Sequence, residues 1–307
     1  MSVGWDSWTR RRPARSSGAT SNPVSEPIGD FEAEVLGALK ASEAGEKLEI
    51  VQRLLEVEFI SGDRHTADRD LPLPGYPDRL RLVDPREVPR RSLGTIEGRA
   101  CFLHAIAHIE FNAINLALDA VYRFGGLPDG YYRDWLEVAR DEACHHAMLE
   151  DRLEELGYRY GDFPAHNGLW DVACRTAHDL VSRMAMVPCV MEARGLDVTP
   201  GMIRRFRDMG DDRSAGLLET ILEEEERHVA IGVAWYRWAC GERGLDPVPT
   251  FFSLLETYLP HRLSGPLNID RRRAAGFDDA WLRHLESAAR PVQDRTNTAV
   301  PVKIRSQ

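Results

Sequence analysis

Apolar residues recur every three or four positions along most of the chain, which is the spacing of amphipathic helices. The four longest periodic segments cover about 92–124, 128–156, 167–194 and 211–240. Gly157 and Gly195 directly follow two of them, and glycine commonly follows the last helical residue. Few segments alternate in the manner of strands. The pattern therefore predicts an all-α protein built on a four-helix bundle, with a further short helix near 201–209.

The regions that flank these segments have different patterns. Residues 1–25 are rich in Ser, Arg and Pro without periodicity, which predicts a disordered tail. Residues 30–59 have helical spacing interrupted near Gly45, which fits two helices or one kinked helix. Five prolines between Ser61 and Arg91 exclude helix interiors there and predict an extended strap over the surface. Beyond residue 244, helices are expected near 250–258 and 276–289.

These boundaries divide the chain into four parts. They are the tail (1–25), the N-terminal helices with the proline-rich strap (26–91), the bundle (92–243) and a C-terminal extension (244–307) that we expect to pack on the bundle. Acidic residues outnumber basic ones by 49 to 39, giving a net charge of −10. Nucleic acid and anionic lipid are therefore not the default partners, although both chain ends are locally basic.

Composition also limits the chemistry. The five cysteines contain no C-x-x-C pair, which argues against a disulfide framework or a thiolate zinc site and favours a reducing cytoplasm. No uninterrupted apolar run approaches the roughly 20 residues of a membrane span, and no signal peptide is evident. Residues 48–302 contain no lysine, which excludes Schiff-base chemistry in the main body. The common phosphate-binding, dinucleotide, serine-hydrolase and zincin motifs are absent.

Carboxylates occupy positions where the helical pattern expects apolar residues. Glu110 lies on the inward stripe of segment 92–124, and Glu142 lies on that of segment 128–156, one turn before His145. Segment 211–240 repeats the arrangement with Glu225 and His228. A buried carboxylate costs several kcal/mol unless it is paired or bound to a metal. Since no lysine is available and a histidine follows two of the glutamates by one turn, we favour metal ligation over ion pairing.

A fourth carboxylate is expected from segment 167–194. Glu192 is the only glutamate between Glu155 and Glu219, with Asp179 as the reserve choice, and Pro188 should bend or bulge the helix nearby. The spacing of 32 residues from Glu110 to Glu142 nearly equals the 33 from Glu192 to Glu225, which suggests two duplicated helical hairpins. Four carboxylates would be balanced by two divalent ions if both histidines stayed neutral.

The acidic residues follow a fixed order along the chain: a lone Glu, an E-x-x-H, a second lone Glu and a second E-x-x-H. This order resembles that of the ferritin-like di-iron carboxylate superfamily. The segments Asp141-Glu142-Ala143-Cys144-His145 and Glu224-Glu225-Glu226-Arg227-His228 resemble its D-E-x-R-H motif, with Cys144 in place of Arg and Glu224 in place of Asp. The resemblance implies that Asp141 and Glu224 each orient a metal-bound histidine by a hydrogen bond. Residues 107–112 and 195–201 are similar to a bacterial ferritin-like family of unknown function.

From these features we expect an enzyme that uses two transition-metal ions, iron first and manganese as the alternative, to activate O2 and hydroxylate or oxidise an organic substrate. Glu142 and Glu225 would bridge the ions, Glu110 and Glu192 would be terminal ligands, and each histidine would bind one ion. A small-molecule substrate is favoured over tRNA. The sequence names no electron donor and leaves a homo-oligomer open.

Three other readings remain: a ferroxidase or metal store, a tRNA-modifying hydroxylase, and a metal-free helical interaction module. Other side chains near the predicted ligands are interpreted as structural. His104 and His108 are expected to face away from Glu110, and Cys144 is expected to pack rather than to ligate. His146 and His178 are weaker candidates for the lining of a cavity.

Overall fold

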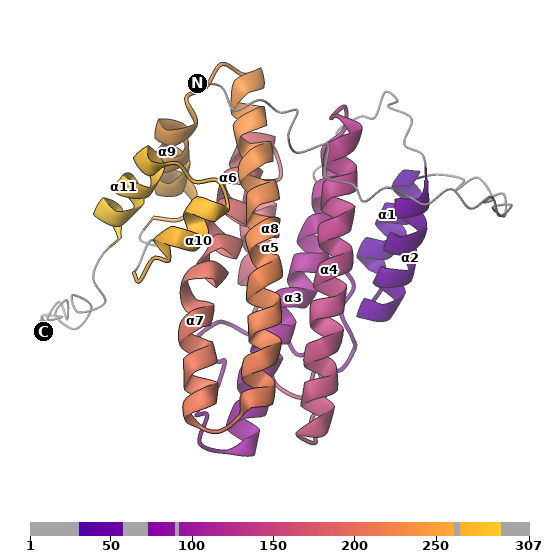
Figure 1. Cartoon of the computed structure of the whole chain (residues 1–307). Helices are drawn as coiled ribbons and strands as arrows, with labels where there is room; N and C mark the ends of the chain where they lie inside the picture. Colours follow the sequence, from indigo (N-terminus) through magenta and orange to yellow (C-terminus); the bar gives the residue numbers. More distant parts are fainter. Residues whose placement is uncertain (1–30, 58–72, 90–91, 261–264, 290–307) are drawn as a thin grey trace, which may run out of the picture.

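The computed structural model describes residues 31–57, 73–89, 92–260 and 265–289, and over these residues the chain is an all-α helical bundle (Figure 1). Helix α4 (Asp129–Glu155) packs against α3 (Ile96–Arg123) and α8 (Asp212–Glu242). The remaining side is built from several shorter elements: α5 (Gly168–Arg175), α6 (Leu180–Met186), a π-helix η2 (Val187–Glu192) and α7 (Ala193–Asp208). The predicted fold class is confirmed.

Local side chains explain where the long helices begin and end. The Thr95 hydroxyl accepts a hydrogen bond from the Gly98 N–H at the start of α3, and the Asp211 carboxylate accepts one from the Ser214 N–H at the start of α8. Gly157 adopts a φ of 84° just after α4, a left-handed conformation that favours glycine. These three helices therefore match the segments that the apolar pattern predicts.

The prediction of one continuous helix over 167–194 is wrong. The chain turns after α5, where the Thr176 hydroxyl donates to the Val172 carbonyl and the Asp179 carboxylate accepts from the Ser182 N–H to start α6. The helix also does not end at Gly195, because η2 continues directly into α7, which absorbs the short helix expected near 201–209.

The predicted bulge at Pro188 is confirmed, since this residue lies in the first turn of the π-helix. Gly232 of α8 makes room for it. A Cβ atom at position 232 would lie 2.1 Å from Pro188 Cβ. The close approach of η2 to α8 brings the end of η2, at Glu192, toward the interior of the bundle.

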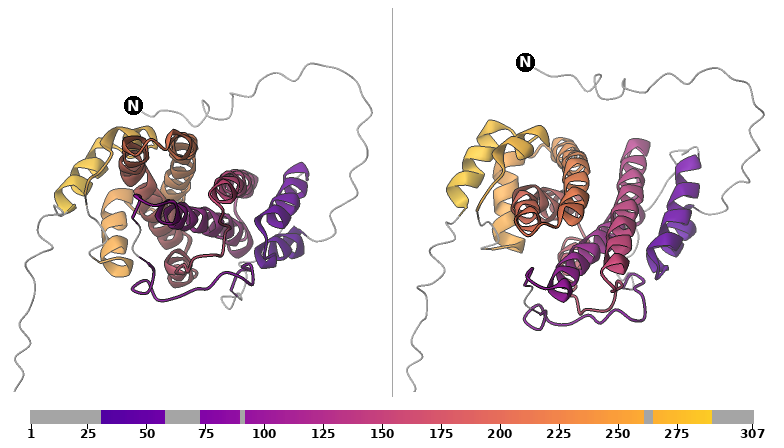
Figure 2. Two further views of the ribbon diagram at one scale, coloured as in Figure 1. Left: turned by 90° about the horizontal axis from the view of Figure 1, so that it is seen from below. Right: turned by 60° about the horizontal axis from the view of Figure 1, so that its bottom comes forward.

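Additional helices lie on two opposite sides of the bundle (Figures 1 and 2). Helices α1 (Phe31–Lys40) and α2 (Ala44–Glu56) pack on α3 and α4 and confirm the two-helix prediction. On the other side, α9 (Pro247–Tyr258) and α11 (Asp279–Ala288) match the predicted helices, whereas α10 (Ile269–Ala274) was not predicted. The predicted tail, 1–25, lies outside the described residues, and the four-part division of the chain stays a prediction.

The described part of the strap, residues 73–89, contains no helix. It is attached to the loop between α4 and α5 by an isolated parallel bridge between Leu82 and Ala165. In this bridge the Val83 N–H donates to the Ala165 carbonyl at 2.8 Å, and the Ala165 N–H donates to the Arg81 carbonyl at 3.0 Å. The described strap therefore lies outside helices, as predicted, but turns at 78–79 and 85–88 interrupt its extended stretches.

Helix α3 lies at the centre of the protein. Among the described residues it is the helix long and apolar enough to cross a membrane, but 83% of its most apolar window is buried inside the fold, as in a core helix. One of its few charges, Asp119, accepts a hydrogen bond from Arg123 at 2.7 Å and another from Arg183 of α6. Because all three side chains are buried, this ion-pair network fixes α6 against α3.

Candidate metal centre

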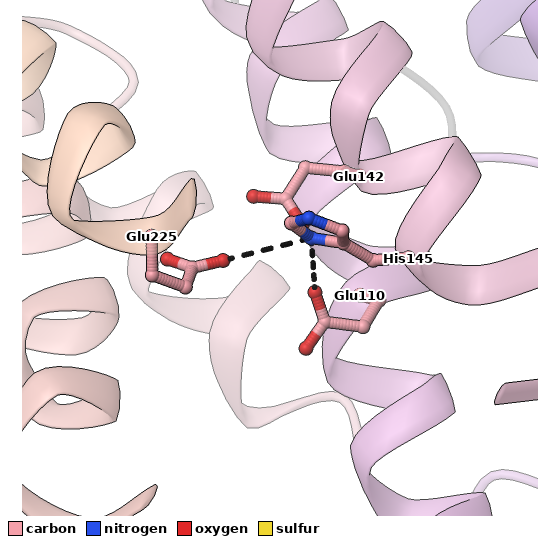
Figure 3. Close-up of side chains that lie close together, drawn as sticks. All are labelled: Glu110, Glu142, His145 and Glu225. Carbon is pink, nitrogen blue, oxygen red and sulfur yellow. Dashed lines mark hydrogen bonds and ion pairs between the residues drawn. The ribbon is translucent and has the colours of Figure 1, made fainter. Parts of the chain in front are cut away.

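Three helices bring acidic and imidazole side chains to one buried point. Glu110 comes from α3, Glu142 and His145 come from α4, and Glu225 comes from α8; all four point toward one another (Figure 3). One potential ligand atom from each of these residues lies within 4.8 Å of the others. His228 of α8 is also fully buried beside this cluster. The i, i+3 spacing puts glutamate and histidine on one helix face, as predicted.

The distances show how the glutamates are placed between the two histidines. His145 Nδ1 lies 3.3 Å from Glu110 Oε2, 3.3 Å from Glu142 Oε2 and 4.0 Å from Glu225 Oε1. His228 Nδ1 lies 2.9 Å from Glu142 Oε1 and 3.6 Å from Glu225 Oε1. Glu142 and Glu225 thus face both imidazoles, whereas Glu110 contacts His145.

Glu192 completes the set of four inward glutamates. It is the last residue of η2, and it lines the same cavity as Glu110, Glu142 and Glu225. Its Oε2 atom is buried without a hydrogen-bond partner. Burial, reinforced by the negative charges of Glu225 and Glu142, raises the pKa of Glu192 to about 8.

Asp179, the reserve choice for this position, lies elsewhere. Its carboxylate accepts a hydrogen bond from the Ser182 N–H at the start of α6 and pairs with Arg243. It does not line the cavity that the four glutamates share. Its role is to begin a helix and to attach the end of α8.

The outer nitrogen of each histidine meets a carboxylate from the other helix. His145 Nε2 lies 2.9 Å from Glu224 Oε2, and His228 Nε2 lies 3.4 Å from Asp141 Oδ2. The acidic residue before each E-x-x-H glutamate therefore contacts the histidine of the opposite motif. A proton held on Nε2 by these carboxylates leaves the Nδ1 lone pair directed at the cluster.

The two histidine–carboxylate contacts differ in their surroundings. Arg140 and Arg227 both pair with Asp141, and although burial alone would raise it, hydrogen bonds from His228 and Arg140 hold the pKa of Asp141 well below its usual range. The Glu224 side chain is instead 49% exposed. Cys144 stands in the first motif where Arg227 stands in the second. The Cys144 side chain is exposed, so the expectation that it packs in the interior is wrong.

The cluster without metal is electrostatically strained. Burial and the charge of Glu142 raise the pKa of Glu110 well above its usual value. Burial alone would lower the pKa of His145, but the adjacent carboxylates of Glu110 and Glu142 raise it to about 11. In the same way Glu142 raises the pKa of His228. Protons therefore act as the counter-charges of the buried carboxylates.

Several polar atoms of the cluster lack hydrogen bonds. They include Glu110 Oε2, Glu142 Oε1, Glu192 Oε2 and His228 Nδ1, all of them buried. Glu142 Oε1 and His228 Nδ1 are 2.9 Å apart but are not aligned for a hydrogen bond. Buried polar atoms normally have partners, and carboxylate and imidazole together suit divalent transition metals. The cluster is therefore compatible with metal binding.

A cavity of about 290 Å³ extends from the carboxylates. Apolar side chains of α3, α7 and α8 form most of its wall, together with Val88 of the strap and residues 164–166 of the loop before α5. Gly195 and Thr199 of α7 also line it. The sequence analysis missed this wall, and a glycine inside a helical segment was the signal that could have indicated it.

The other histidines have structural contacts. His108 Nδ1 lies 2.8 Å from the Tyr160 hydroxyl, and His104 Nε2 accepts a hydrogen bond from the Gly161 N–H at 2.9 Å. His108 also reaches the cavity wall, whereas His146 and His178 do not. His146 is buried among aromatic rings and His178 is exposed, so the suggestion that these two line the cavity is wrong.

Comparison with known proteins provides a family but no activity. Residues 40–283 match a family model described as "Protein of unknown function (DUF455)". An "Uncharacterized protein" of Haemophilus influenzae is 41% identical to this chain, and the match covers 84% of this chain and 96% of the relative. No solved structure matches.

Proposed function

The chain belongs to the DUF455 family of unknown function, and we propose that it is a dinuclear metal oxidoreductase of the ferritin-like di-iron carboxylate type. It binds two divalent transition-metal ions, preferably iron and alternatively manganese, and uses O2 to hydroxylate or otherwise oxidise an organic substrate. One observation carries the proposal: two buried histidines direct Nδ1 at the same carboxylates, and each turns Nε2 to a carboxylate of the other helix.

The positions of the side chains suggest a role for each ligand. Glu142 and Glu225 face both histidines and would bridge the two ions. Glu110 and Glu192 would each bind one ion, as would His145 and His228. Four carboxylates and two divalent ions give a neutral centre with neutral imidazoles, which removes the strain of the metal-free cluster.

When bound, the ions would supply the redox chemistry and the binding of O2. The chain itself provides the rest of the site. Asp141 and Glu224 hold the imidazole rings in orientation through Nε2. The cavity beside the carboxylates has a mostly apolar wall and provides space for a substrate. This cavity favours the oxidation of a small molecule over metal storage.

Elemental analysis of anaerobically purified protein tests the proposal, followed by O2 exposure with optical and Mössbauer measurements. We expect two ions of iron or manganese per chain and a spectral change that requires O2. Fewer than one tightly bound ion per chain would refute the proposal in favour of a metal-free helical module.

The same preparation separates the remaining alternatives. A closed high-mass assembly in size-exclusion chromatography that accumulates iron mineral would indicate a metal store. A shift of bulk tRNA in native gels would indicate a tRNA-modifying hydroxylase, against which the net charge of −10 argues. A cytoplasmic location also remains part of this proposal.

A further inference from the structure

The wall of the cavity beside the carboxylates is mostly apolar, and His108, His166 and Thr199 are its uncharged polar residues. Its apolar side chains come from five separate parts of the chain and include Val88, Ile109, Leu169, Val198, Met202 and Ile221. Apart from the four glutamates, Arg194 is the charged residue among the described lining residues. Its guanidinium donates to the Pro266 carbonyl at 3.2 Å and lies 3.6 Å from Asp197. The described wall therefore offers no unengaged cation for an anionic group.

Gly195 has no structural reason to be glycine. It lies inside α7, where alanine would stabilise the helix, and its backbone does not adopt a positive φ. A Cβ atom at this position would meet no other atom within 4 Å, in contrast to Gly232, where it would collide with Pro188. Gly195 lines the cavity one turn after Glu192. The missing side chain therefore keeps open a space directly beside the cluster.

The cavity reaches the protein surface beside α3. Ile109 lines the cavity and is 49% exposed, although large apolar side chains are usually buried. Val88 of the strap and residues 164–166 complete this side of the wall, and the bridge between Leu82 and Ala165 joins the two segments. An apolar molecule can therefore reach the cavity between α3 and the strap, past Ile109.

We propose that this cavity binds an uncharged apolar group of the substrate, which enters past Ile109 and packs against Gly195 next to Glu192. A volume of about 290 Å³ holds roughly ten water-sized groups, which corresponds to a chain of about eight carbons with one polar atom. That the occupant is a substrate rests on the proposed function. Binding of the apolar group itself depends only on the cavity.

A series of 1-alkanols from butanol to dodecanol tests the proposal on the full-length protein as purified, by calorimetry or ligand-observed NMR. We expect the affinity to rise about fourfold per methylene up to a length near 1-octanol and then to level off. Octanoate should bind at least tenfold more weakly than 1-octanol. Equal or tighter binding of octanoate, or no binding of any alkanol, would overturn the proposal.

Variants of two glycines in α7 locate the binding site. Gly195→Leu should weaken 1-octanol binding at least tenfold. Gly201→Leu is the matched control, because Gly201 does not line the cavity and a Cβ there would meet only Arg204 Nη2, at 3.8 Å. Gly195→Ala, which favours the helix, should shift the preferred alkanol to a shorter chain even if the leucine variant does not fold. Unchanged binding in both Gly195 variants would refute the assignment.

Metal content, measured on the same samples, separates this inference from the proposed function. Alkanol binding that depends on Gly195 in a protein without bound metal would support the cavity and refute the oxidoreductase. Two bound ions without alkanol binding would refute the cavity assignment and leave the metal centre standing.

Discussion

Replacing Glu142 with alanine removes a carboxylate that lies within 3.3 Å of both cluster histidines, and we expect it to abolish binding of the metal pair. Two unit charges 4 Å apart interact by about 4 kcal/mol at an effective dielectric constant of 20. A bridging carboxylate meets two divalent ions, so the gross loss is larger, and water entering the gap recovers a part of it. A net loss of about 4 kcal/mol corresponds to roughly 1,000-fold weaker binding.

Competition with a chromogenic chelator measures this loss, and elemental analysis after dialysis gives the occupancy. Glu223→Ala is the matched control, since Glu223 is an exposed carboxylate on α8 that lies close to the cluster in sequence. The control should retain both ions. Two tightly bound ions in Glu142→Ala would refute the bridging role and the electrostatic reasoning behind it.

Three further predictions follow from the charges of the fold. Metal binding should release protons near pH 7, because Glu192, whose pKa is about 8, still holds a proton there that the metal displaces. Binding should therefore tighten as the pH rises toward 8. Calorimetry in two buffers of different ionisation enthalpy measures the proton release. Asp141→Asn should weaken metal binding by about 10- to 100-fold. Glu224→Gln should weaken it less, because the Glu224 side chain is half exposed. A larger loss of affinity for Glu224→Gln in chelator competition would contradict this expectation. Asp119→Ala should destabilise the protein by about 3–5 kcal/mol in urea unfolding, because it leaves Arg183 buried without its carboxylate. Burial alone would raise the pKa of Asp119, but Arg183 and Arg123 hold it below its value in the unfolded chain. The stabilisation that Asp119 gives the wild type is therefore present above the unfolded pKa and is lost as the pH falls through the folded pKa.

The parts of the fold that could be predicted are those in which one face of a helix is buried along its whole length. Helices α3, α4 and α8 have such faces, and residues such as Thr95 and Gly157 mark their ends. Segment 167–194 retains a helical pattern although Asp179 starts a new helix inside it. Gly195 resembles the glycine that follows the end of a helix, but it lies inside α7 and lines a cavity whose other walls come from distant parts of the sequence.

The candidate site divides in a similar way. The E-x-x-H spacing places Glu142 with His145, and Glu225 with His228, by helix geometry alone, and the structure brings both pairs together with Glu110. Which carboxylate contacts which outer nitrogen depends instead on how α4 lies against α8. The crossed contacts of His145 and His228 could therefore not be derived from the order of residues in either motif.

The bridge between Leu82 and Ala165 joins two stretches that lie far apart in the sequence, and both stretches line the entrance of the cavity. The carboxylate cluster, by contrast, draws on helices α3, α4 and α8 and on η2 alone. None of the predicted ligands lies in the strap or in the loop before α5, whereas both stretches contribute to the wall of the cavity. Substitutions at Val88 or Pro164 can therefore reshape the entrance while the predicted ligand set stays intact.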